Sequence, residues 1–301
     1  MTDRACIAGV LLLASIAACG RGRAGTIVVA SKNFTEQSIL GELVAQQIER
    51  AGLQVNRRFY LGGTLLCHQA LVSGRIDVYV EYTGTAFTAI LKRKPVHDPR
   101  EVFRQTSEAY ARQFGVTLGE PLGFNNTFAI LVRADAARRL GIKTIGDAAR
   151  HAPEWTASFG PEFMEREDGF RGLAAVYGLR FREPPRVMDL GLTYRALADG
   201  KVDLIAGDST NGLIAALDLA VLDDDRGYFP PYEAVPFVRS AALSAHPQLG
   251  PALAALGGKI PDDTMRRLNQ AVDGEHRDAA SVVRQFLDGL SARNASGGTA
   301  R

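Results

Sequence analysis

The sequence predicts an α/β protein of two lobes, each a doubly wound sheet with helices, joined by two crossing strands. Short apolar runs rich in β-branched residues alternate with helical segments near the N-terminus, in the order βαβαβ. The same alternation starts again after residue 125, and one more strand followed by helices comes after Pro230 and Pro231. A second α/β unit is therefore expected to be inserted into the first, which gives two hinged lobes with a cleft between them.

The first unit opens with the run Thr-Ile-Val-Val-Ala at 26–30, which suits a parallel strand that is buried on both faces. Thr35 is a plausible N-cap for the helix that follows, whose apolar residues fall on one face. Gly52 and Gly74 end the two helices of this unit. Its expected elements are a strand at 26–30, a helix at 36–51, a strand at 54–60, a helix at 64–73 and a strand at 76–80.

The second unit and the returning segment follow from the same periodicities. Their expected elements are strands at 127–132, 155–159 and 202–206, an extended segment at 186–189, helices at 172–177 and 194–198, and then a strand at 234–239 with helices at 249–256, 261–272 and 279–290. Lobe 1 is thus expected at 26–124 and 233–290, and lobe 2 at 125–232. Residues 291–301 are rich in Ser, Gly, Ala and Arg, which predicts a disordered tail.

The N-terminus has the features of a secretion signal. Residues 1–18 carry Arg4 and then an apolar run that is too short to span a bilayer and ends on small residues before Cys19. A cysteine at this point resembles a bacterial lipobox, which implies cleavage before Cys19, a lipid on its thiol and a tether at 19–25. The alternative is a plain secretory signal that contains a cysteine. Both readings place the mature protein outside the cytoplasm, and the first one anchors it to a membrane.

The composition excludes several classes of function. The apolar fraction is 46% and the formal net charge is +2, which is typical of a soluble globular protein. Basic residues are scattered rather than clustered, so no nucleic-acid partner is expected. With Cys6 removed and Cys19 lipidated, Cys67 is left alone in an apolar stretch and is expected to be a buried, inert thiol.

No catalytic or cofactor motif is complete. The segment from Gly207 begins like a nucleophile elbow, but Asn211 stands where the second glycine is needed. The five histidines lack the spacing of metal ligands, and Gly62-Gly63 is not followed by the Gly-Lys-Ser/Thr of a phosphate loop. The sequence therefore favours a binding protein over an enzyme, with no cofactor and no metal.

Short motifs spread over nearly the whole mature chain carry a resemblance to one family. They are Ser31-Lys32-Asn33-Phe34-Thr35-Glu36-Gln37, Leu61-Gly62-Gly63-Thr64, Glu81-Tyr82-Thr83-Gly84-Thr85, Phe124-Asn125-Asn126-Thr127, Arg166-Glu167-Asp168-Gly169 and Phe229-Pro230-Pro231-Tyr232. The chain resembles the substrate-binding proteins of ABC transporters for osmoprotectants such as glycine betaine, choline and carnitine. The resemblance implies a type II periplasmic-binding-protein fold and a monomer that delivers a quaternary-ammonium solute to an ABC permease.

A quaternary ammonium has no N–H group, so proteins bind it through aromatic faces, at about 2 kcal/mol or more for a desolvated ring. The family builds a box of tyrosines for this purpose. On the family pattern the four box positions of this chain are Tyr82, Phe128, Asp208 and Tyr232. The resemblance therefore implies a box with two tyrosines, a phenylalanine that keeps its ring face, and a carboxylate in place of the remaining ring.

Asp208 is the departure that bears most on ligand choice. Its carboxylate would attract a cation and repel a nearby ligand carboxylate, which disfavours glycine betaine and favours choline-like cations or betaines with a more distant carboxylate. The other reading is that Asp208 caps the helix that follows, since Asp208-Ser209-Thr210-Asn211 has the composition of an N-cap. Both readings stay open at this point.

The family's carboxylate-holding positions map onto Lys32, Thr85 and Arg166, so the resemblance implies that an anionic group of the ligand is still recognised. The alternatives are a solvated loop charge for Lys32 and a surface ion pair with Glu165 or Glu167 for Arg166. The ligand itself is left open between choline, glycine betaine, carnitine, ergothioneine and other betaines. An envelope sensor built on the same lobes is a further alternative to an importer.

Overall fold

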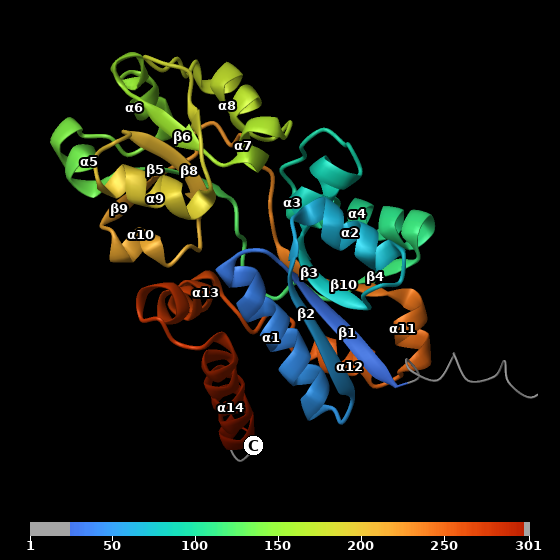
Figure 1. The fold of residues 1–301 in the computed structure, drawn as a ribbon. Helices are drawn as coiled ribbons and strands as arrows, with labels where there is room; N and C mark the ends of the chain where they lie inside the picture. The colour runs from blue at the N-terminus through green and yellow to red at the C-terminus, as the bar shows by residue number, and fades with distance from the viewer. Residues whose placement is uncertain (1–24, 298–301) are drawn as a thin grey trace, which may run out of the picture.

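The computed structural model describes residues 25–297, and this part of the chain forms two five-stranded mixed sheets with helices packed against each (Figure 1). We call sheet 1 with its helices lobe 1, and sheet 2 with its helices lobe 2. The two-lobed α/β architecture predicted from the sequence is confirmed. Cys19 and the predicted signal segment 1–18 lie outside the described residues. Within those residues, no helix has the length and apolar character needed to cross a membrane.

Sheet 1 has the strand order β2-β1-β3-β10-β4, in which β1 runs parallel to β2 and β3, and β10 runs antiparallel to β3 and β4. Its strands are β1 (Thr26–Lys32), β2 (Gln54–Gly62), β3 (Val78–Tyr82), β4 (Val116–Leu118) and β10 (Ala234–Arg239). The helical segments of lobe 1 are α1 (Thr35–Arg50), α2 (Thr64–Val72), α3 (Thr83–Thr85), η1 (Ala86–Ile90), α4 (Pro99–Phe114), α11 (Ser240–Ala245), α12 (Leu249–Ala254), α13 (Asp262–Asn269), η3 (Gln270–Gly274) and α14 (Ala279–Gly297).

Sheet 2 repeats this plan with the order β7-β6-β8-β5-β9, in which β6 runs parallel to β7 and β8, and β5 runs antiparallel to β8 and β9. Its strands are β5 (Phe128–Arg133), β6 (Ala157–Phe159), β7 (Arg186–Val187), β8 (Leu204–Asp208) and β9 (Leu219–Leu222). The helical segments of lobe 2 are α5 (Ala134–Leu140), α6 (Ile145–Ala149), η2 (Ala152–Glu154), α7 (Pro161–Glu165), α8 (Phe170–Tyr177), α9 (Leu190–Ala198) and α10 (Leu213–Ala216).

Two antiparallel segments connect the lobes. The chain leaves sheet 1 after β4 and returns to it at β10, and the outgoing and returning segments bridge at Asn125 and Glu233. The backbone N–H of Asn126 donates to the carbonyl of Tyr232 over 3.1 Å, and the N–H of Tyr232 donates to the side-chain oxygen of Asn125 over 2.5 Å. We call this paired crossover the hinge, and Tyr232 lies on it.

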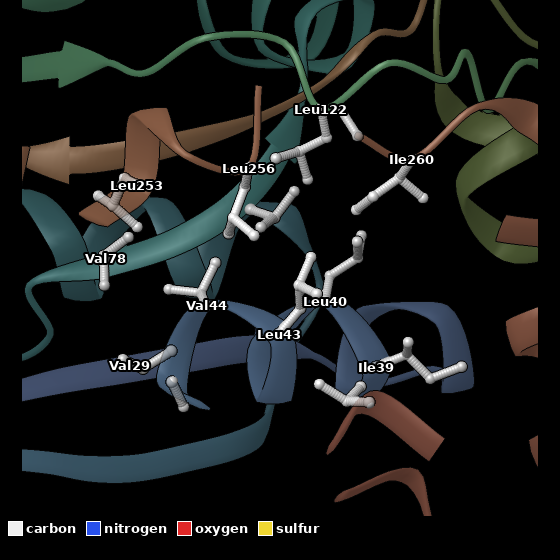
Figure 2. Packing of buried hydrophobic residues seen from close by; sticks show 14 of the residues in the cluster. Val29, Ile39, Leu40, Leu43, Val44, Val78, Leu122, Leu253, Leu256 and Ile260 are labelled. Carbon is white, nitrogen blue, oxygen red and sulfur yellow. The ribbon is translucent and has the colours of Figure 1, made fainter. Parts of the chain in front are cut away.

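The core of lobe 1 is formed where α1 packs on the sheet. Ile39, Leu40, Leu43 and Val44 follow the helical spacing of an apolar face, and all four are almost completely buried. Figure 2 shows them packed together with the strand residues Val29 and Val78 and with Leu253, Leu256 and Ile260 from the C-terminal part of the chain. The segment after β10 is therefore needed to complete the lobe that the first hundred residues begin.

Several elements differ from the sequence-based expectations. Thr35 starts α1 but does not cap it, because its hydroxyl donates 2.7 Å to Asp273 and the N-cap position falls on Phe34 without a side-chain bond. α4 was missed, although Asp98 accepts a bond from its first turn and Gly115 ends it in the left-handed region, at φ 62°. α14 continues to residue 297, where a disordered tail was expected from Ser291.

Cys67 behaves as predicted. It is completely buried, and its thiol lies 3.6 Å from the carbonyl oxygen of Gly62 and 3.7 Å from that of Ser31. Burial raises the pKa of this thiol to about 12, which keeps it in the protonated, unreactive form at neutral pH.

Candidate ligand-binding site

A cavity of about 460 Å³ lies between the two lobes. All the residues predicted to bind ligand line it: Lys32, Tyr82, Thr85, Phe128, Arg166, Asp208 and Tyr232. Further lining residues, to which sequence reasoning assigned no ligand-binding role, include Asn33, Phe34, Asn126, Glu162, Phe163, Asp189 and Leu190. The structure thus brings together side chains that lie up to 200 residues apart in the sequence.

The strand ends position most of these side chains. Lys32 and Tyr82 are the last residues of β1 and β3, which are parallel neighbours, so both reach the same edge of sheet 1. In sheet 2, Phe128 at the start of β5 pairs directly with Asp208 at the end of β8. Each lobe therefore presents one sheet edge to the cavity, and the hinge adds Tyr232.

Tyr82 is anchored through its hydroxyl. The ring is 5% exposed, and its O–H donates over 2.5 Å to Oε1 of Glu36, a buried carboxylate near the start of α1. Asn126 donates to the same oxygen over 2.9 Å. Burial raises the pKa of Glu36, while the hydrogen bonds that its carboxylate accepts counteract the rise.

Tyr232 has a matching anchor on the other wall. Its hydroxyl donates over 2.5 Å to Oδ2 of Asp168, which also receives two bonds from Arg166: 2.8 Å from Nε to Oδ1 and 2.5 Å from NH2 to Oδ2. This bidentate, buried pair overturns the alternative of a surface ion pair with Glu165 or Glu167. The pKa of Asp168 is lowered because its bonds to Arg166 and Tyr232 outweigh the cost of burial.

Arg166 also joins the lobes. Its NH1 group donates over 3.2 Å to the hydroxyl of Thr85 in α3, and NH2 donates over 3.3 Å to that of Thr88 in η1. The guanidinium carbon lies 5.1 Å from the centroid of the Phe128 ring and 5.7 Å from that of Tyr232. Arg166 thus occupies the wall between two box rings.

Lys32 is buried rather than solvated, which overturns the alternative of a loop charge. Its ammonium lies 2.6 Å from Oε1 of Glu81, and both side chains are almost completely buried. The same nitrogen lies 4.4 Å from the centroid of the Tyr82 ring and 5.6 Å from that of Phe34. Both basic residues expected to hold a ligand carboxylate therefore already face a protein carboxylate.

Asp208 has no such partner. No described residue donates a hydrogen bond to its carboxylate, and desolvation together with the nearby Glu36 raises its pKa to about 7. Asp208 is also not the cap of α10, because the side-chain oxygen of Asn211 accepts the bond from the N–H of Leu213. The N-cap interpretation of Asp208 is therefore wrong, since Asn211 serves the start of that helix.

The aromatic wall is larger than the sequence indicated. The ring of Phe128 meets that of Tyr232 edge to face at 5.7 Å, and it packs against Phe163 at 4.8 Å and Phe229 at 5.9 Å. Phe163 lies in α7 and lines the cavity, and the Gly160-Pro161 helix start is the sequence signal for its position. The cavity itself is lined by Tyr82, Phe128, Phe163, Tyr232 and Asp208. These side chains form a surface suited to a cation that carries no hydrogen-bond donor on its nitrogen.

Among residues 25–297, no group of three or more His, Cys, Asp and Glu side chains is placed to hold a metal ion. The arrangement is one of aromatic faces, paired charges and the unpaired carboxylate of Asp208 around a cavity of small-molecule size.

Comparisons with known proteins agree with this chemistry. Residues 25–289 match the profile of a family described as the substrate binding domain of ABC-type glycine betaine transport system. The chain is 32% identical over 278 residues to the carnitine transport binding protein of Listeria monocytogenes, covering 91% of this chain and 89% of that one. It is 33% identical over 287 residues to a glycine-betaine-binding protein of Pseudomonas aeruginosa, covering 92% of each.

A further relative is the ergothioneine transport permease/ergothioneine binding protein of Helicobacter pylori, at 35% identity over 265 residues; the match covers 88% of this chain and 47% of that longer protein. Among solved structures, a glycine betaine/carnitine/choline ABC transporter protein matches with a TM-score of 0.76 and 33% identity, over 87% of this chain and 97% of that one. The lactococcal glycine betaine complex matches in fold alone, with a TM-score of 0.61, 13% identity and coverage of 89% and 97%.

Proposed function

The chain belongs to the family of substrate-binding domains of ABC-type glycine betaine transport systems, and we propose that it captures a quaternary-ammonium solute in the cleft between its lobes. It has the two-lobed type II periplasmic-binding-protein fold of that family. It is a substrate-binding protein of betaine-, carnitine- or choline-type transport, a class that binds and delivers solutes.

One observation carries the proposal. Tyr82, Phe128 and Tyr232 line a single cavity with Asp208, and the two basic side chains beside them, Lys32 and Arg166, each form an ion pair with a buried protein carboxylate. Since those cations are already neutralised, the unpaired carboxylate of Asp208 gives the cavity a local preference for a positive ligand. The three rings supply cation–π attraction to its methylated nitrogen.

Capture works through closure of the lobes. Lys32, Tyr82 and Thr85 come from lobe 1, Phe128, Arg166 and Asp208 come from lobe 2, and Tyr232 comes from the hinge. A ligand that contacts both walls stabilises the closed state over the open one, whereas a ligand that contacts one wall gives no such preference. The closed form, acting as a monomer, then presents the solute to an ABC permease.

Ergothioneine is a second candidate ligand. It is a trimethylammonium betaine whose heterocyclic ring carries N–H donors, and a relative at 35% identity is described as an ergothioneine transport permease/ergothioneine binding protein. The observation that favours it here is Asp208, because an unpaired carboxylate can accept a hydrogen bond from such an N–H group.

Calorimetric titration of the mature protein with choline, carnitine, glycine betaine, proline betaine and ergothioneine tests the proposal. We expect at least one quaternary amine to bind and to be displaced by the others, while dimethylglycine and proline bind far more weakly. Binding of proline or another non-quaternary solute in preference to the whole panel would contradict the proposal.

We further propose that the protein works outside the cytoplasm and is held to a membrane by a lipid on Cys19. Residues 1–19 lie outside the described part of the structure. The support for this proposal is therefore the resemblance of their sequence to a lipobox.

A further inference from the structure

Glu36 is a buried carboxylate, 4% exposed, that sequence reasoning did not single out. Its two oxygens accept hydrogen bonds from four side chains: Tyr82 O–H at 2.5 Å and Asn126 at 2.9 Å on Oε1, and Asn269 at 2.8 Å and Thr210 O–H on Oε2. Four donors fill the lone pairs of a carboxylate.

The donors come from both lobes and from the crossover between them. Tyr82 ends β3 of lobe 1, Asn126 lies on the hinge, Asn269 ends α13 of lobe 1, and Thr210 follows β8 of lobe 2. The bond between Thr210 and Glu36 therefore crosses from one lobe to the other. Thr210 is two residues after Asp208, which lines the ligand cavity.

The backbone around Thr210 is fitted closely to lobe 1. Asn269 donates over 2.7 Å to the carbonyl of Thr210, and a Cβ at Gly212 would lie 2.7 Å from the N atom of Gln270. Since the φ of Gly212 is −63°, an ordinary value for any residue, it is this contact between the lobes that excludes a side chain.

We propose that Glu36 is a positioning residue that links the Tyr82 ring to closure of the lobes. One oxygen orients the ring that meets the ligand, and the other holds the loop 209–212 of lobe 2 against lobe 1. Because all four donors share one carboxylate, the closed lobes and the correctly oriented ring stabilise each other. This role rests on the proposed ligand-binding function, but the junction itself exists independently of the ligand's identity.

Two physical features separate this role from ordinary core packing. A buried carboxylate that loses a donor keeps its desolvation cost, so opening of the lobes leaves Glu36 short of a partner unless water replaces Thr210. A phenol that donates to a carboxylate also gains electron density on its ring, which strengthens attraction of a cation to its face.

The test uses Glu36→Gln, which keeps the shape and replaces one acceptor oxygen by a donor, in a Cys19→Ser background without lipid. The matched control is Glu42→Gln, because Glu42 is a buried carboxylate of the same helix that bonds Arg57 and Gln46 away from the cleft. We expect Glu36→Gln to weaken choline binding roughly tenfold and to reduce ligand-induced compaction measured by X-ray scattering, with no such change in Glu42→Gln.

A readout without ligand follows the hydroxyl proton of Tyr82 by NMR, where a short bond to a carboxylate gives a downfield signal. The signal is assigned by its loss in Tyr82→Phe and its retention in Tyr232→Phe. Thr210→Val should shift it and should also reduce compaction, because Thr210 and Tyr82 donate to the two oxygens of the same carboxylate. Gly212→Ala should reduce compaction in the same way, by preventing the loop from docking.

Separate results overturn the two proposals. Glu36 has no coupling role if Thr210→Val leaves the chemical shift of the Tyr82 hydroxyl proton unchanged, and if Glu36→Gln has the choline affinity and the ligand-induced compaction of wild type. If wild type binds no quaternary amine while the Tyr82 signal responds to Thr210→Val, the junction stands and the proposed ligand class is wrong.

Discussion

The ammonium of Lys32 lies 4.4 Å from the centroid of the Tyr82 ring, and the same nitrogen is 2.6 Å from Oε1 of Glu81. The Tyr82 ring thus has a cation–π contact with Lys32, a cation of the protein itself. Arg166 stands in the same relation to the other wall, at 5.7 Å from the Tyr232 ring and paired with Asp168. Since both cations are neutralised locally, the ligand's positive charge is not repelled by two free charges in the cavity.

Removing Lys32 alone should destabilise the protein, so this single variant is a poor test of the role of Lys32 in ligand binding. Lys32→Met leaves Glu81 buried without its partner, and we expect the free energy of unfolding to fall by about 3–5 kcal/mol. Lys32→Met with Glu81→Gln removes both charges and should recover most of that loss, as measured by urea denaturation.

The double variant then tests whether Lys32 holds a ligand carboxylate. Glycine betaine has a carboxylate and choline has none, so loss of Lys32 should weaken glycine betaine relative to choline. Equal changes for both ligands, in calorimetry on the folded double variant, would remove Lys32 from the anion-binding positions.

The two box tyrosines should respond differently to Ala and Phe. Tyr82→Ala and Tyr232→Ala each remove a ring face and should weaken binding by roughly 1–2 kcal/mol, about tenfold or somewhat more. Tyr82→Phe and Tyr232→Phe keep the face, so their loss of affinity should be smaller. If Phe and Ala variants lose the same affinity, the hydroxyls rather than the ring faces dominate binding.

The Phe variants carry a separate cost, because each hydroxyl donates to a buried carboxylate, Glu36 or Asp168. Removal of a donor leaves that acceptor short of a partner, which should lower the free energy of unfolding by about 1–3 kcal/mol. Thermal unfolding of both variants, compared with Tyr60→Phe at an exposed position, measures this cost.

The sequence was sufficient for most of the strands, although β4 and β9 were not predicted. Tyr82 could be placed at a strand end because buried apolar strands are easily detected and parallel strands bring their carboxyl ends to one edge, whereas Asp208 was placed by the family resemblance. That these residues bind a ligand stays a prediction. The carboxylates behind them, Glu36, Glu81 and Asp168, could not be assigned, because a buried polar contact depends on tertiary placement rather than on local pattern.

Local sequence signals were overlooked at one helix and assigned to the wrong residue at another. Asp98, Pro99 and Gly115 bracket α4 with ordinary start and stop chemistry, so that helix could have been predicted. At Asp208 a local signal was assigned to the wrong residue. The polar run before α10 does contain a side chain that accepts a bond from the first turn of the helix, but β8 continues through Asp208, and the acceptor is Asn211.

The anchor can be tested without reference to the described structure. Cys19→Ser should block lipidation and release the protein from the membrane fraction, because one acylated terminus would be the main hydrophobic attachment. Fractionation of cells that express wild type and variant checks this, with a signal-processing assay as control. A processed variant that stays with the membrane would contradict the lipobox prediction.

Asp208 should make both stability and ligand choice depend on pH. Its pKa is raised from 3.8 to about 7, so between these values the folded protein binds more protons than the unfolded chain. The free energy of unfolding contributed by this group therefore falls as pH rises through that window and is level above it. Asp208→Asn should remove this dependence, which urea denaturation across the pH range measures.

Ligand binding should show the opposite sign, because a cation beside Asp208 stabilises the ionised carboxylate. Choline affinity is expected to rise by up to about tenfold per pH unit below about pH 7 and to level off above it.

Asp208→Asn should abolish the rise and weaken choline binding at about pH 8. Asp208→Tyr should shift preference toward glycine betaine by adding a ring and removing a repulsive charge. The ratio of choline to glycine betaine affinity in the three proteins decides the matter. If that ratio is the same in all three folded proteins at both ends of the pH range, the carboxylate does not meet the ligand.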